Sequence, residues 1–134
     1  MDITTVGAIL YWCEGSKRED DRRVEFVNSD PRMISVFMKY LRTKDIDEAR
    51  IRARMTIHVQ DEERECKDYW KSVTSLKDTN FISTVVKSPS FSKKPLRYGN
   101  IAIRYNSLQL LRQIKEEISN LAEEISETLP QKPV

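Results

Sequence analysis

The chain has few of the residues from which metal centres and disulfide frameworks are built. It holds one histidine and two cysteines, Cys13 and Cys66, which lie far apart in the sequence. This spacing argues against a zinc site and a disulfide framework, so a reduced, cytoplasmic setting is expected. No apolar run approaches the ~20 residues that span a bilayer, and residues 1–12 lack the features of a signal peptide. We therefore expect no membrane partner.

Low-complexity linkers and internal repeats are missing as well. The 134 residues are enough for one domain but not for two. We expect residues 1–126 to form this domain, with a long C-terminal helix that begins near residue 107. Residues 127–134 are expected to be a frayed tail.

The small net charge of +2 conceals an uneven distribution. Residues 107–134 carry three basic side chains against five glutamates, which leaves +4 on residues 1–106. From Ile82 to Arg104 there are five cations and no acid. A basic body with an acidic tail is compatible with a polyanionic partner.

Local patterns predict four helices. Apolar spacings of three and four predict a first helix over residues 3–14. The segment "SDPRM" starts a second helix, because Ser29 or Asp30 can cap it while Pro31 suits its first turn. A third helix is predicted in "DEERECKDYWKSVTSL" and a last one from about residue 107.

The last helix carries a heptad-like apolar seam. This seam is longer than a compact domain requires. One reading is that the seam covers the back of the sheet, and the other is that it mediates self-association. The seam consists of Leu111, Ile114, Ile118, Leu121 and Ile125.

Four segments are typical of strands: "RRVEFVNS", "IRARMTIHV", "FISTVVKS" and "GNIAIRYNS". The last two are joined by the basic loop 88–99. The order of helices and strands predicts an α+β fold. We expect a mainly antiparallel sheet that helices cover on one face and leave open on the other.

The segment "IRARMTIHV" alternates apolar and polar residues most clearly. Ile51, Ala53, Met55, Ile57 and Val59 point to one side of the predicted strand. The opposite side would then present a cationic, polar face to phosphates and to the edges of guanines. The alternative is that these are ordinary solvated side chains. The candidate DNA-binding residues are Arg52, Arg54, Thr56 and His58 on this face, and Lys17, Arg22, Lys87, Lys93, Lys94 and Arg97 elsewhere.

Three segments in order resemble the LAGLIDADG homing endonucleases and their relatives. They are "GAILYWCEG" followed by "GSK", the strand ending in "VEFVNSDP", and the helix "MISVFMKYL". The resemblance implies a LAGLIDADG-like fold in which the first helix pairs with its mate at the centre of a homodimer. It places Gly7, Ala8 and Tyr11 at that interface. Ile9 and Trp12 depart from the family pattern, which implies wider helix spacing or use of a different helix face.

The resemblance also implies a catalytic centre. Glu14 would be the motif acid that binds Mg²⁺ or Mn²⁺ at the scissile phosphates, because hard cations prefer carboxylate oxygens. Ser29 would position water, although it can equally cap the second helix. Arg104 would stabilise the transition-state phosphate, although a plain contact with the DNA backbone, or an ordinary surface arginine, is equally compatible with its position.

Three functions follow as hypotheses. The first is sequence-specific binding of double-stranded DNA by a homodimer, with Mg²⁺-dependent site-specific endonuclease activity. The second is a non-cleaving DNA-binding regulator on the same scaffold. The third is an RNA-binding cofactor of splicing, similar to the maturases.

Overall fold

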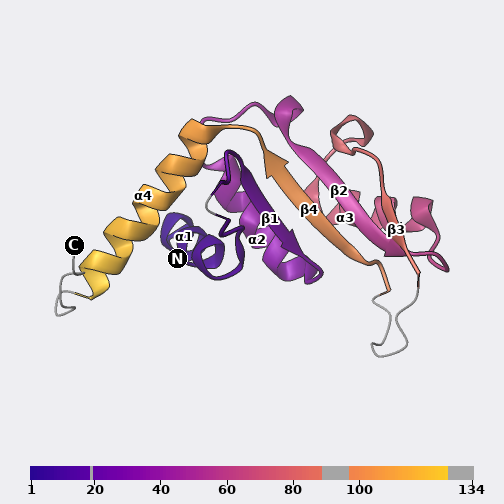
Figure 1. Cartoon of the computed structure of the whole chain (residues 1–134), viewed down its shortest axis with the longest axis horizontal. Coiled ribbons are helices and arrows are strands. Elements are labelled where there is room, and N and C mark those ends of the chain that lie inside the picture. The colour runs from indigo at the N-terminus through magenta and orange to yellow at the C-terminus, as the bar shows by residue number, and fades with distance from the viewer. Residues whose placement is uncertain (19, 89–96, 127–134) are drawn as a thin grey trace.

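The computed structural model describes residues 1–18, 20–88 and 97–126 of the chain (Figure 1). The expected tail 127–134 and the candidates Lys93 and Lys94 therefore lie outside the described residues. The helices are α1 (Ile3–Glu14), α2 (Pro31–Arg42), α3 (Glu63–Thr74) and α4 (Leu108–Ile125). The strands are β1 (Val24–Asn28), β2 (Arg52–His58), β3 (Val85–Lys87) and β4 (Asn100–Tyr105), and short 3₁₀ turns span Glu48–Arg50 and Asp78–Asn80.

The four strands form one mixed sheet in the order β1-β4-β2-β3. The β1–β4 and β4–β2 pairs are antiparallel, whereas β3 runs parallel to β2. The α+β class is confirmed, and two of the three strand pairs are antiparallel, in line with the expected mainly antiparallel sheet; the β2–β3 pair is the parallel exception. Its cause is α3, which connects β2 to β3 and supplies the long crossover that parallel neighbours require.

Alternation along the strands sets the core on one face of the sheet. The inward residues of β2 are at most 2% exposed and share one core cluster with the apolar stripe of α2. Asp30 rather than Ser29 caps α2, since its carboxylate accepts a hydrogen bond from the Arg32 N–H. Val59, predicted to face the core, is instead 65% exposed because it lies beyond the end of β2. The stripe of α2 consists of Ile34, Phe37, Met38 and Leu41, joined by Tyr40.

Helix α1 packs closely on α2 at Gly7. A Cβ atom added to Gly7 would lie 2.0 Å from Cγ of Tyr40, so only glycine fits this contact. Ala8 and Tyr11 are also buried within the chain, which differs from their expected place at a dimer interface. The large apolar side chains that α1 exposes are Ile9 and Trp12.

Helix α4 is buried only along its first half. Leu111 and Ile114 are almost fully buried, whereas Ile125 is 68% exposed. Figure 1 shows the C-terminal end of α4 extending past α1. Midway along, Glu117 accepts a hydrogen bond from the Tyr40 hydroxyl at 2.9 Å and pairs with the ammonium group of Lys44. This contact fixes α4 to α2. None of the described helices has the length and apolar character needed to cross a membrane.

Candidate nucleic-acid interface

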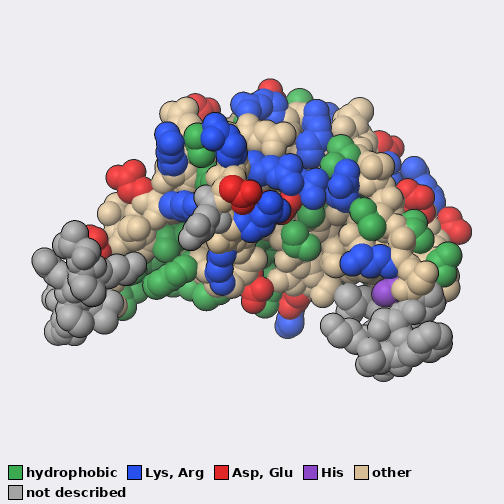
Figure 2. Space-filling model, in the orientation of Figure 1, with side chains coloured by type: hydrophobic (Ala, Val, Ile, Leu, Met, Phe, Trp, Pro, Cys, Tyr) green, Lys and Arg blue, Asp and Glu red, His purple; other side chains and the backbone are tan. Residues whose placement is uncertain are grey.

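No described helix covers the second face of the sheet, and its outward side chains are mostly cationic or polar. Strand register sets them in rows across β1, β4 and β2. Figure 2 shows Lys and Arg side chains gathered over the strands in this view. Within the described strands, Glu25 is the only acid that points outward. The rows are Glu25–Arg104–Arg52, Val27–Ala102–Arg54, Asn100–Thr56–Val85 and His58–Lys87.

Glu25 holds two of the neighbouring arginines. Its carboxylate accepts hydrogen bonds from Nη2 of Arg23 at 3.2 Å and from Nε of Arg104. The side chains of Glu25 and Arg104 are only 17% and 19% exposed, so solvent screens this pair less than a surface ion pair. Arg104, predicted to contact a scissile phosphate, is therefore paired with a carboxylate that it shares with Arg23 in this structure.

The two outward arginines of β2 differ in how the protein holds them. Nη1 of Arg52 donates hydrogen bonds to the backbone oxygens of Ala49 and Ile51, at 2.7 and 3.0 Å. Arg54 has Ala102 as its cross-strand partner. Its Nε is buried and has no hydrogen-bond partner among the described residues. A buried donor without an acceptor is costly, but because this atom is itself buried, a ligand would meet the Nη atoms of Arg54 rather than its Nε.

The far end of the face carries further polar and cationic groups. Nδ1 of His58 is also buried and unpartnered within the described part of the chain. Lys87 is the neighbour of His58 on β3 and is exposed. The guanidinium of Arg97 lies 5.0 Å from the centre of the Tyr98 ring, a cation–π contact. Lys87 and His58 extend the outward face onto β3. Arg97 precedes β4 beside Tyr98, whose ring stacks on Tyr69 of α3, so Arg97 does not belong to the outward rows.

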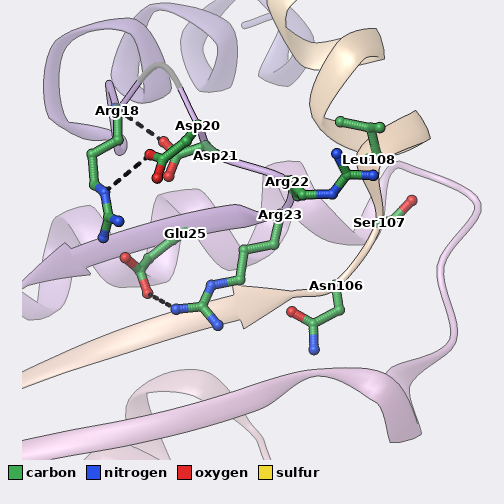
Figure 3. A pocket seen from close by; sticks show the side chains of 9 residues that line it. All are labelled: Arg18, Asp20, Asp21, Arg22, Arg23, Glu25, Asn106, Ser107 and Leu108. Carbon is green, nitrogen blue, oxygen red and sulfur yellow. Dashed lines mark hydrogen bonds and ion pairs between the residues drawn. The ribbon is translucent and has the colours of Figure 1, made fainter.

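A cavity of about 540 Å³ opens where β1 and β4 meet the start of α4 (Figure 3). Glu25 and Arg23 line it, so the cavity continues the sheet face. The carboxylate of Asp21 accepts hydrogen bonds from the Ser16 hydroxyl and the Arg18 N–H, at 2.6 and 3.1 Å. The full lining is Arg18, Asp20, Asp21, Arg22, Arg23, Glu25, Asn106, Ser107 and Leu108.

The three predicted catalytic residues are not brought together. Glu14 is exposed at the end of α1, and Ser29 is exposed just after β1. Arg104 lies opposite Glu25, four residues along β1 from Ser29, a separation of about 13 Å along the strand. The described residues of one chain contain no group of three or more His, Cys, Asp or Glu side chains able to hold a metal ion. One chain therefore does not by itself fit the predicted Mg²⁺ site.

Lys17 also has a role within the chain. Its ammonium group donates to the backbone oxygen of Cys13 at 3.0 Å, at the C-terminal end of α1. A cation there complements the partial negative charge of the helix end.

Sequence reasoning missed the part played by Glu25. The segment "RRVEFVNS" does set Arg23 and Glu25 on the same outward side, two residues apart. It does not show that Arg104, 79 positions further along the chain, closes the ion pair.

Neither protein-family models, nor curated proteins, nor solved structures yield a match to this chain. The functional argument therefore depends on the sheet face itself.

Proposed function

We propose that the protein binds double-stranded DNA sequence-specifically as a homodimer and that the outward sheet face is the binding surface. One observation carries the proposal: the face is uncovered and rich in arginine, and it holds one outward acid within the described strands. That acid is already paired with arginines. Polyanions are attracted to such a surface, and DNA affinity depends largely on such contacts.

The spacing of the arginines suits a duplex. Arg52 and Arg54 point the same way along β2, about 7 Å apart, and strands can enter the major groove. Arginine pairs bidentately with guanine there, and this pairing is the commonest specific contact. No hydrogen bond or ion pair holds the guanidinium of Arg54 within the described residues, and its Nε is buried, so a base-reading role would use its Nη atoms. Arg52, held by backbone oxygens, is better suited to contact a phosphate.

The exposed side of α1 supports a homodimer. Ile9 and Trp12 are 40% and 48% exposed on one helix, and large aromatic side chains typically anchor protein interfaces. The resemblance to LAGLIDADG proteins, in which the equivalent helices pair, favours a second copy as the partner. A two-fold axis through this contact would present two sheet faces to one duplex and favour a palindromic target.

Cleavage would need a group from each copy. Glu14 supplies one exposed carboxylate, and the described residues of one chain offer no further cluster of ligands around it. A second Glu14 would have to come from the partner. Because Arg104 is paired with Glu25, the non-cleaving regulator also has an observation in its favour.

Selection of bound duplexes from a random pool tests this function. Enrichment of a shared, roughly palindromic sequence is the expected result. Incubating the selected duplexes with Mg²⁺ or Mn²⁺ then distinguishes cleavage from binding alone. Failure to retain duplex DNA, or a preference for structured RNA in a parallel selection, would contradict the proposal.

A further inference from the structure

The groove beside α4 is a second cationic feature, next to the sheet face. A cavity of about 300 Å³ adjoins the one in Figure 3 and shares four of its lining residues: Asp20, Asp21, Arg22 and Leu108. It adds Leu111, Arg112 and Lys115 from the next turns of α4. We call the two cavities together the α4 groove.

The free charge of this groove is positive. Its lining holds five cationic side chains against three acidic ones. Asp20 pairs with Arg18 at 3.5 Å, whereas Asp21 accepts hydrogen bonds from two neutral groups, the Ser16 hydroxyl and the Arg18 N–H, and keeps its charge. In contrast, Arg22, Arg112 and Lys115 have no ion pair among the described residues. All three are exposed.

The groove is continuous with the sheet face. Glu25 and Arg23 line one end of it, and Glu25 also holds Arg104 in the middle of the face. Figure 3 shows Arg22 extending toward the first turn of α4. From Leu108 to Lys115 the groove follows α4 for about 10 Å. Within it, Arg22 reaches the first turn of α4 and Arg112 and Lys115 follow on the next turns (Figure 3), a spread of charge that matches a phosphodiester backbone better than a single phosphate.

We propose that the α4 groove binds the phosphodiester backbone of the same DNA duplex outside the segment read by the sheet. This inference rests on the proposed function and adds a flanking contact to it. Arg22, Arg112 and Lys115 bind phosphates without reading bases, so they raise the affinity for every sequence alike.

The test uses the full-length Arg112→Gln/Lys115→Gln double variant, with Lys39→Gln on the exposed side of α2 as the control. Binding is measured over a salt series on a duplex trimmed to the selected site, and on one extended by a helical turn at each end. We expect the double variant to lose affinity for the extended duplex equally for all sequences. The slope of log K against log salt should fall by about two units. The trimmed duplex and Lys39→Gln should show little change.

The outcomes separate the two proposals. If wild type binds duplex DNA and the double variant binds the extended duplex equally well, the groove proposal is wrong while the sheet proposal stands. An altered base preference in the double variant would also overturn it, because the groove would then read sequence. If wild type binds no duplex DNA, or binds only RNA, both proposals fail.

Discussion

Arg54 is the side chain for which the structure and the proposed function agree most closely. It points outward from β2, and its cross-strand partner on β4 is the small residue Ala102. Its buried Nε has no acceptor among the described residues, whereas Arg52 donates to two backbone oxygens. The two arginines should therefore respond differently to mutation.

We expect Arg54→Ala to weaken binding to the selected duplex by about 1–3 kcal/mol and to relax specificity at one base pair. Arg54→Lys should keep much of the affinity but not the specificity, because lysine lacks the planar fork. Arg52→Ala should weaken binding to all duplexes alike and lower the slope of log K against log salt by about one unit. Fluorescence anisotropy on the selected and single-mismatch duplexes measures each effect. Equal, sequence-independent losses for Arg54→Ala and Arg52→Ala would argue against base reading by Arg54.

Glu14 allows a second residue-scale prediction. Its side chain is exposed and makes no hydrogen bond or ion pair within the described residues. Glu14→Gln should therefore leave the melting temperature unchanged. Metal-free DNA affinity should stay level or rise, because an anion near phosphates is removed. If two Glu14 side chains hold a metal, Mg²⁺-dependent cleavage should fall by several orders of magnitude.

Glu65→Gln, at an exposed position on α3, is the matched control for this change. A Glu14→Gln protein that melts earlier, and binds less only in proportion to its folded fraction, would show that Glu14 is structural.

Among the elements, α1 depends on one close contact. Gly7 lies against the base of the Tyr40 ring, and Tyr40 is itself fully buried and bonded to Glu117. The ring has little room to move. This contact sets the position of α1 on α2 and so determines which side of α1 is exposed.

Gly7→Ala should destabilise the protein by about 1–3 kcal/mol, because the new methyl group overpacks the contact. Alanine favours helices by up to about 1 kcal/mol over glycine, so the clash must outweigh that gain. Urea unfolding at one fixed protein concentration measures the difference, with the exposed Thr4→Ala as control. A Gly7→Ala variant more stable than wild type would mean that α1 does not approach Tyr40 so closely.

Elements with strong local signals could be predicted from the sequence. The bounds of α1, the Asp30–Pro31 start of α2 and the alternation along β2 all match the structure. These features arise from neighbours within one or two turns or strand positions. The parallel pairing of β3, the Gly7–Tyr40 contact and the Glu25–Arg104 pair join distant segments, so no local pattern specifies them. The polar face was predictable, but its ion pairs were not.

At the scale of the whole molecule, the account requires two copies. Light scattering should give a mass near twice 15.7 kDa, and Trp12→Glu should give a monomer that remains folded. Cys13 is exposed beside Trp12, whereas Cys66 is buried and burial raises the pKa of its thiol. A short bis-maleimide should therefore link two wild-type chains through Cys13.

The cross-link should persist in Cys66→Ser and disappear in Cys13→Ser. A Trp12→Glu protein that still dimerises would show that the interface does not lie on α1. The exposed end of α4 would then be the next surface to mutate. A strict monomer at micromolar concentration would remove the two-fold model altogether.

The most direct test of the central claim is an amide NMR titration of the full-length protein with the selected duplex. The account predicts that resonances of β1, β4 and β2 shift together with those of residues 18–23 and the first turns of α4. Resonances of the solvent-facing sides of α2 and α3 should stay in place. Shifts confined to α2 and α3, with the strands unchanged, would contradict the claim that the open sheet face binds DNA.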